Sequence, residues 1–322
     1  MHKTAVILLN MGGPDSLSAV EPFLYNLFCD NDIFHIPFGQ KLFAKMIAGR
    51  RAPKVIEKYR EIGGKSPINE WTEKQRRALQ NELLKEVPHV EVFTGMRYWH
   101  PMIRDVAKTV SSGEFGKIVL LPLYPHHSVT TTGSSFNEFK RYYSGDPEKL
   151  IFVAAYPEQD TYIRAINERI DESLEEFPLK LKNEVQLVFS AHGTPLSLVK
   201  KGDPYSFHIK KTVERVMDER GHSHEYHLCF QSKVGPVKWL TPETDTVIET
   251  LGRKNIKQLL MIPVSFVSDH IETLHELNIE YREIADRVNI ENYIVMKGLN
   301  DSPYFCTALK EIALDALKKD KR

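Results

Sequence analysis

Cysteine is scarce in this chain, and the few cysteines lie far apart. The 322 residues contain three of them, Cys29, Cys229 and Cys306, and none belongs to a Cys-x-x-Cys pair. Three scattered thiols cannot build a disulfide framework or a four-thiolate metal site. The chain therefore fits a reducing compartment, and we expect a cytoplasmic protein.

The sequence also lacks an excess of either charge and a long hydrophobic run. Lysine and arginine number 43, as do aspartate and glutamate, so we expect no nucleic-acid partner. The longest uncharged run, Ile118 to Asn137, contains two prolines and two histidines, which argues against a membrane span. We expect no signal peptide, because Lys3 leads directly into a short apolar run. Any membrane contact should then be peripheral, at the inner face.

Apolar runs of strand length recur through the chain, and each ends in a turn. The first, Thr4 to Leu9, is uniformly apolar, as parallel strands covered on both faces tend to be. The order of strand, proline, polar loop and helix occurs in both halves. Val6–Pro14 resembles Leu187–Pro195 in layout, and Ile118–Pro125 resembles Leu259–Phe266. This repeat predicts an α/β protein with two similar doubly wound domains, parallel sheets and a ligand-binding cleft between them.

The predicted domains differ mainly in an unusually apolar lip at about residues 23–50. We assign residues 1–158 to the N-terminal domain, 159–302 to the C-terminal domain, and 303–322 to a helix that packs back on the first domain. The lip mixes apolar side chains with basic ones, namely Lys41, Lys45, Arg50 and Arg51. Such a segment can roof an apolar ligand or rest on a membrane surface, although helix faces packed on the core explain it as well.

A histidine follows the central strand of the second half. Val185 to Phe189 is apolar, and His192 lies in the turn just beyond it. Ligands of open α/β sheets bind outside the carboxyl ends of the strands. An imidazole at that place can bind a metal or transfer a proton near neutral pH. A histidine that only caps the turn explains the same pattern, because a lone histidine is a weak signal.

Carboxylates follow a later strand at regular spacing. Glu272, Glu276 and Glu280 are each four residues apart on a predicted helix. Like charges at this spacing destabilise a helix slightly, and binding a divalent cation would explain the stripe. Alternatively, Asp269 and Glu272 form a capping box, in which Glu272 only bonds to the helix backbone. If His192 and Glu272 face each other, an imidazole and a carboxylate suit Fe²⁺ and proton transfer.

Other loops carry aromatic, basic or imidazole side chains. Arg97 beside Tyr98 suits a flat anionic ligand, although a surface turn explains the pair equally well. Adjacent histidines such as His126 and His127 rarely converge on one metal ion, and the Gly63–Gly64 loop lacks the Walker spacing of a phosphate site. A large flat apolar ligand would suit the aromatic side chains near strand ends, which are Tyr98, Tyr205, Trp239 and Phe266.

Together these motifs resemble the ferrochelatase family, whose members insert Fe²⁺ into a porphyrin at the end of haem synthesis. The resemblance covers nearly the whole chain. It rests on LNMGGP (Leu9–Pro14), YREIGGKSPINEWT (Tyr59–Thr72), GMRYWHP (Gly95–Pro101), YPHHSVTTTGSS (Tyr124–Ser135), FSAHGTP (Phe189–Pro195) with KGDPY (Lys201–Tyr205), QSKVGPVKWLTPETD (Gln231–Asp245) and FVSDHIETLHELNIEY (Phe266–Tyr281).

The resemblance implies a role for each matching residue. His192 and Glu272 would be catalytic residues and metal ligands that act from opposite faces of the porphyrin, with Asp269 and His270 as their hydrogen-bonded neighbours. Glu276 and Glu280 would form an acidic path for cations and protons, and they would also supply further metal ligands. The porphyrin would contact Met11, Arg97, Tyr98, Tyr205, Trp239 and Phe266, and the apolar lip would border its pocket.

Departures from the family pattern and open alternatives complete the prediction. The chain lacks the cysteine-rich C-terminal extension of animal relatives, so we expect no iron–sulfur cluster and no other cofactor, with Fe²⁺ as a substrate. The lip and the QSKVGP…WL region resemble the branch that uses protoporphyrin IX. Coproporphyrin III as substrate, a cobalt or nickel tetrapyrrole chelatase, and a non-enzymatic porphyrin or haem carrier are the alternatives. The oligomeric state is left open.

Overall fold

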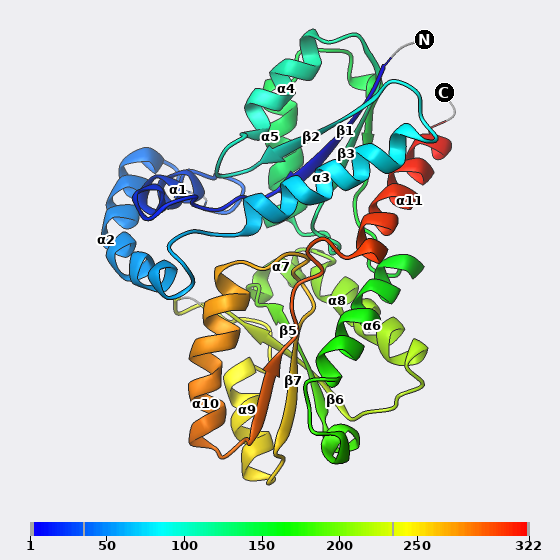
Figure 1. The fold of residues 1–322 in the computed structure, drawn as a ribbon. Helices are drawn as coiled ribbons and strands as arrows, with labels where there is room; N and C mark the ends of the chain where they lie inside the picture. Colours follow the sequence, from blue (N-terminus) through cyan, green and yellow to red (C-terminus); the bar gives the residue numbers. More distant parts are fainter. Residues whose placement is uncertain (1–2, 35, 234, 321–322) are drawn as a thin grey trace. The chain divides into compact units, whose positions relative to one another are not determined.

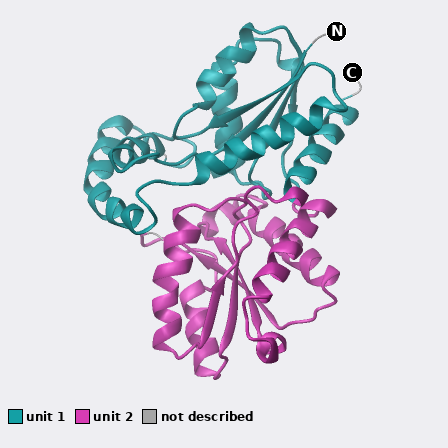
Figure 2. Cartoon of the chain, in the orientation of Figure 1, with its two compact units in different colours: residues 1–156, 305–322 teal, residues 157–304 magenta. Residues whose placement is uncertain are grey.

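The computed structural model describes residues 3–34, 36–233 and 235–320, which form two compact units (Figure 1). Unit 1 runs to Tyr156 and resumes at Phe305, and unit 2 extends from Pro157 to Tyr304 (Figure 2). These divisions lie close to the boundaries that the sequence predicts at residues 158 and 302. The cleft expected between the domains stays a prediction.

Unit 1 is built on a parallel four-stranded sheet in the order β2–β1–β3–β4. Its strands are β1 (Lys3–Asn10), β2 (Val90–Met96), β3 (Phe115–Pro122) and β4 (Leu150–Phe152). Its helices are α1 (Val20–Phe28), α2 (Gln40–Glu61), α3 (Ile68–Leu84), α4 (Ile103–Ser112), α5 (Ser134–Tyr142) and α11 (Pro303–Lys319), which enters the unit at Phe305.

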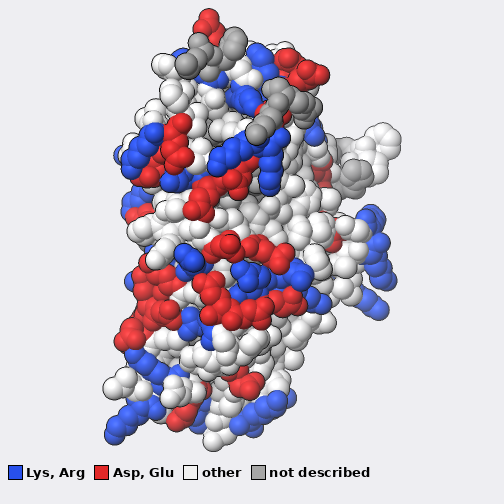
Figure 3. Space-filling model, turned by 90° about the vertical axis from the view of Figure 1, so that its right-hand side faces the viewer, with Lys and Arg blue, Asp and Glu red and all other residues white. Residues whose placement is uncertain are grey.

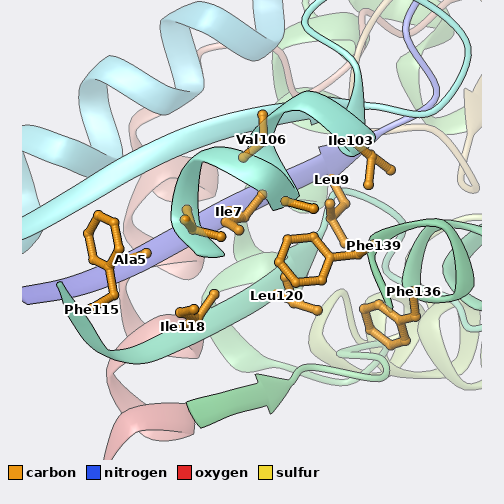
Figure 4. Close-up of a cluster of buried hydrophobic side chains, with 12 residues drawn as sticks. Ala5, Ile7, Leu9, Ile103, Val106, Phe115, Ile118, Leu120, Phe136 and Phe139 are labelled. Carbon is orange, nitrogen blue, oxygen red and sulfur yellow. The ribbon is translucent and has the colours of Figure 1, made fainter. Parts of the chain in front are cut away.

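The core of unit 1 shows why β1 reads as an uninterrupted apolar run. Ala5, Ile7 and Leu9 point to one face of the sheet, where they meet side chains from α4 and α5 (Figure 4). Val6 and Leu8 are fully buried as well, on the opposite face. Each large side chain buried in this way contributes about 1.5–3 kcal/mol. Helices on both faces of the sheet therefore require the uniformly apolar strand.

Unit 2 repeats this arrangement with a second parallel sheet, in the order β6–β5–β7–β8. Its strands are β5 (Gln186–His192), β6 (Tyr226–Gln231), β7 (Gln258–Pro263) and β8 (Asn292–Val295). Its α-helices are α6 (Asp160–Leu174), α7 (Leu196–Lys200), α8 (Tyr205–Glu219), α9 (Thr244–Arg253) and α10 (Tyr281–Arg287). The strand orders correspond one to one, with β1 matching β5 and β3 matching β7. The predicted fold class and internal repeat are confirmed.

Two of the described segments are π-helices, and the first of them, Val129–Gly133, directly precedes α5. The second, Glu272–Glu280, lies directly before α10. In a π-helix each backbone hydrogen bond spans one residue more than in an α-helix. Such segments are rare in proteins, but those that occur are often found at functional sites. The stripe of glutamates that the sequence places on a regular helix therefore lies on a wider one.

The charges on the surface agree with the balanced composition, and the helices agree with the lack of a long hydrophobic run in the sequence. Figure 3 shows acidic and basic side chains interspersed on one face of the molecule, without a broad field of one sign. Across the residues that the structure describes, no helix is both long and apolar enough to cross a membrane.

Candidate active site

His192 is the last residue of β5, at the carboxyl end of the sheet in unit 2. Its backbone pairs with Gln231 at the end of β6, whereas pairing with β7 stops two residues earlier, at Ser190 and Pro263. The next residue must be glycine, because a Cβ on Gly193 would lie 2.7 Å from the carbonyl oxygen of Gln231. The His192 side chain remains 38% exposed. The imidazole therefore lies at the edge where ligands of such sheets bind.

Glu272, the first residue of the π-helix, contacts this imidazole directly. Its Oε2 lies 3.0 Å from Nδ1 of His192, and its side chain is 23% exposed. The structure brings the two residues into direct contact, whereas the sequence leads us to expect them on opposite faces of a porphyrin. A hydrogen-bonded pair leaves no room for a flat ring between its members.

The pair shifts the acidity of both groups. Burial disfavours the charged imidazole, but the charge and hydrogen bond of Glu272 outweigh burial and raise the pKa of His192. Burial likewise opposes ionisation of Glu272, yet the facing imidazole lowers the pKa of that carboxyl well below its usual range. The pair therefore holds one proton as an imidazolium–carboxylate contact over a wide pH range.

Asp269 and His270 lie next to Glu272 in different roles. Asp269 accepts hydrogen bonds from Gly298 N, Asn300 Nδ2 and Thr273 Oγ1, at 2.7–3.1 Å. It therefore ties the start of the π-helix to the loop after β8, and Glu272 reaches the imidazole of His192 rather than completing a capping box. His270 bonds through Nδ1 to the carbonyl of Ser268, and its Nε2 lies 3.8 Å from Oε2 of Glu272.

Glu276 is held by groups that the sequence did not single out. It accepts hydrogen bonds from Gln231 Nε2, from Ser232 N and Oγ, and from the Tyr281 hydroxyl. Burial and then the charge of Glu272 raise the pKa of Glu276. The QSK motif at the end of β6 was the available signal, since it places Gln231 and Ser232 beside the strand end that pairs with His192.

Glu280 lies at the far end of the π-helix, where its side chain is 40% exposed and its Oε1 is 3.8 Å from Nδ1 of His275. The three glutamates thus pass from a pair with histidine, through a part-buried network, to a more exposed position. That order fits the predicted acidic path, which no contact in the structure tests.

Aromatic side chains surround His192, as predicted for part of the set. The Phe266 ring lies 6.2 Å from the imidazole, edge to face, and 4.5 Å from His270. Trp239 packs close to Gly193, since a Cβ there would lie 3.3 Å from its ring. Tyr205 directs its hydroxyl to the carbonyl oxygen of His192 instead of an open surface. The structure therefore groups Phe266, Trp239 and Tyr205 with the imidazole.

The remaining predicted residues belong to unit 1, where they form a second cluster. Arg97 Nη2 lies 3.0 Å from Oδ1 of Asp30, and both side chains are buried. The Tyr98 hydroxyl donates to the other Asp30 oxygen at 2.7 Å, and Ser134 donates to the same oxygen. The backbone of Met11 accepts the Tyr98 N–H. Sequence reasoning missed Asp30, although an acid inside the apolar lip was a usable signal.

Two glycine-containing loops have structural explanations. Gly63 and Gly64 have φ of +97° and +85°, and their N–H groups satisfy carbonyls at the end of α2. The Gly13 peptide is held on both sides by the Asn69 amide, at 3.1 and 2.7 Å. Gly63 and Gly64 therefore end α2, and Gly13 joins its loop to α3.

Metal binding by this site would use few protein ligands. Over residues 3–34, 36–233 and 235–320, no group of three or more His, Cys, Asp or Glu side chains is arranged to hold a metal ion. His192 and Glu272 offer one imidazole and one carboxylate, which suit Fe²⁺ and other first-row metals. Two ligands fit an ion in transit better than a resident one.

Comparison with known proteins identifies relatives over almost the whole chain. A family model described as Ferrochelatase matches residues 3–317. A ferrochelatase of Geobacter metallireducens is 48% identical over 320 residues, which cover 98% of this chain and 99% of that relative. A ferrochelatase of Aquifex aeolicus is 46% identical over 313 residues and is matched over 98% of its length, as against 96% of this chain.

Solved structures resemble the chain in fold alone. The sirohydrochlorin chelatase SirB of Bacillus subtilis subspecies spizizenii, in complex with cobalt, matches with a TM-score of 0.54 at 10% identity and covers 98% of this chain and 96% of its own. CbiX, a terminal enzyme of sirohaem biosynthesis in denitrifying bacteria, matches with a TM-score of 0.52, also at 10% identity, over 98% and 99% of the two chains. Both support the arrangement of two similar domains.

Proposed function

The chain belongs to the ferrochelatase family, and we propose that it inserts Fe²⁺ into protoporphyrin IX to form protohaem, the last step of haem biosynthesis. Family membership makes it a porphyrin metal chelatase of haem synthesis. The choice of protoporphyrin IX, and the classification as a lyase, are part of our proposal.

The observation that carries the proposal is the partly exposed pair of His192 and Glu272 at the carboxyl end of β5. A free porphyrin has two inner N–H protons, and both must leave when one Fe²⁺ enters. The reaction therefore releases two protons for each metal ion bound. An imidazole and a carboxylate in contact can accept protons near neutral pH and can ligate the incoming ion.

In this mechanism the pair first gives up the proton that it shares, because an imidazolium can neither ligate iron nor accept a pyrrole proton. Phe266 and Trp239, which flank His192, provide apolar surface for one face of the macrocycle. Holding the ring out of plane would contribute a few kcal/mol toward the transition state. Released protons would leave along Glu276, whose raised pKa suits a transient acceptor, and Glu280.

The substrate is tested by supplying protoporphyrin IX and coproporphyrin III side by side with Fe²⁺ under anaerobic conditions. We expect faster formation of the iron complex from protoporphyrin IX. Turnover of coproporphyrin alone would contradict our choice of substrate, and tight porphyrin binding without product would favour a carrier. Cobalt and nickel should compete poorly with iron, because the relatives that share sequence with the chain are ferrochelatases, whereas the cobalt-bound neighbour shares only the fold.

We also propose that the apolar lip contacts a membrane surface peripherally. The start of α2 buries small residues, Ala44, Ala48 and Ala52. Large side chains are exposed here: Leu42 and Met46 on α2 at 75% and 61%, and Phe38, just before the helix, at 93%. Exposed Lys41 and Lys45 lie beside them. Apolar side chains flanked by cations are typical of surfaces that rest on anionic lipid.

Two further parts of the proposal concern cofactors and location. We propose that the enzyme carries no iron–sulfur cluster, since its three cysteines are too few for four thiolate ligands. Burial raises the pKa of Cys229 to about 12, so this thiol is a poor ligand. The three free cysteines also support a reducing, cytoplasmic location.

A further inference from the structure

The main chain of His192 is held by two hydroxyl groups to which the proposed chemistry assigns no step. Its N–H donates to Oγ of Ser265, and its carbonyl oxygen accepts from the Tyr205 hydroxyl, each at 2.9 Å. Ser265 also hydrogen-bonds to Tyr205. We infer that Tyr205 and Ser265 are positioning residues, which fix the imidazole of His192 for chelation. This inference rests on the proposed function.

The direction of each hydrogen bond follows from the groups involved. The His192 N–H can only donate, so Ser265 accepts from it, and the His192 carbonyl can only accept, so Tyr205 donates to it. The proton of Ser265 is then the one available for the bond between the two hydroxyls. Donation then runs in one direction, from the His192 N–H through Ser265 and Tyr205 to the His192 carbonyl.

The sheet explains why side chains are needed at this place. Alternate residues of a parallel strand direct their backbone groups to the same neighbour, and Val264 N donates to the carbonyl of Ser190. The backbone groups of His192, two residues on, therefore face the same side. Pairing with β7 has already ended there, at Pro263. The hydroxyls of Ser265 and Tyr205 take the place of the missing strand.

Tyr205 is itself held firmly. It is the first residue of α8, its N–H donates to Oδ1 of Asp203 at 3.0 Å, and the preceding Gly202 turns the chain at φ +90°. The Tyr205 residue is 7% exposed. The KGDPY motif thus places the Tyr205 hydroxyl at the main-chain carbonyl of His192. This role differs from the porphyrin contact that the family resemblance implies for Tyr205.

Three substitutions and a matched control test the inference. Tyr205→Phe and Ser265→Ala each remove one hydroxyl, whereas Ser265→Thr keeps it. Tyr156→Phe is the control, because Tyr156 is also buried and also donates to a backbone carbonyl, that of Pro122 in unit 1. We expect Tyr205→Phe and Ser265→Ala to lower kcat roughly tenfold to a hundredfold, since small misplacements of a catalytic group cost about that much. The KM for porphyrin should stay within about twofold, because both hydroxyls bond to the main chain of His192 in the structure.

A substrate-free measurement separates this inference from the proposed function. Amide hydrogen exchange at His192 should become about tenfold faster or more in Ser265→Ala, and Ser265→Thr should restore both exchange and kcat. If Tyr205→Phe raises the porphyrin KM with kcat unchanged, Tyr205 contacts substrate and the inference fails. It also fails if His192 exchanges equally in Ser265→Ala and wild type, or if Tyr205→Phe behaves like Tyr156→Phe. A wild-type chain that makes no metalloporphyrin would overturn the proposed function, while exchange would still decide whether the hydroxyls hold His192.

Discussion

Nδ1 of His192 lies 3.0 Å from Oε2 of Glu272, although eighty residues separate them in the chain. The contact joins the end of β5 to the first residue of a π-helix, so both groups meet at the edge of one sheet. The imidazole and the carboxylate are therefore one contacting pair in the structure.

His192→Ala and Glu272→Gln should each lower kcat by about 10²–10⁴-fold, the usual contribution of a positioned acid or base. Their effects should be far from additive, because either change removes the same pair. Initial rates of metalloporphyrin formation measure this, with circular dichroism as a check on folding. Activity close to that of the wild type in a folded His192→Ala protein would refute the assignment.

The pair should also give the metal-free protein a characteristic pH dependence of stability. The lowered pKa of Glu272 contributes stability above its unfolded value of 4.5, and the raised pKa of His192 contributes below its unfolded value of 6.5. The contribution of Glu272 is lost as the pH falls through its folded pKa, and that of His192 as the pH rises through its folded pKa. Between pH 4.5 and 6.5, Glu272→Gln should therefore cost most, about 1 kcal/mol, because partial exposure screens the pair. Urea unfolding across pH measures this, and a cost that grows toward alkaline pH would contradict it.

Arg97→Met should destabilise unit 1 by about 3–5 kcal/mol, because it leaves the buried carboxylate of Asp30 without its cation. Arg141→Met is the matched control, since Arg141 pairs with Asp32 while 45% exposed and should cost at most about 1 kcal/mol. Denaturant unfolding compares the two. Unchanged stability with a raised porphyrin KM would instead make Arg97 a substrate contact.

Gly193→Ala should disturb the backbone just after His192. The new Cβ would lie 2.7 Å from the carbonyl oxygen of Gln231 and 3.3 Å from the ring of Trp239, and a strand carbonyl cannot move aside cheaply. We expect a loss of about 1–3 kcal/mol in stability, together with reduced turnover. Gly133→Ala, with only ordinary contacts at its Cβ, is the control and should be nearly neutral. Equal behaviour of the two variants would count against the close approach at Gly193.

Leu42→Ser in the lip should weaken binding to anionic vesicles without loss of stability, because the side chain is already 75% exposed. Leu179→Ser removes a comparably exposed leucine, 82%, outside the lip and should leave vesicle binding unchanged. Vesicle sedimentation at low and high salt measures both. Equal loss in the two variants, or none in either, would contradict a role of the lip at membranes.

The sequence alone determined the fold class, the internal repeat and the two residues at the centre of the site. Apolar runs of strand length such as Thr4–Leu9 report burial on both faces of a parallel sheet, which is a local property of the chain. The carboxyl ends of parallel strands lie at one edge of a sheet, so the sequence also placed His192 and Glu272 at the edge where ligands of such sheets bind.

Only the tertiary structure decided how these groups meet. The direct contact of His192 with Glu272, the burial of Arg97 against Asp30, and the hydroxyls of Tyr205 and Ser265 behind His192 all join segments far apart in the chain. Such contacts depend on where strands stop pairing and how loops fold back, which local periodicity does not encode. Sequence patterns therefore identified candidate residues, whereas packing directs the Tyr205 hydroxyl to the His192 carbonyl and ties Asp269 to the loop after β8.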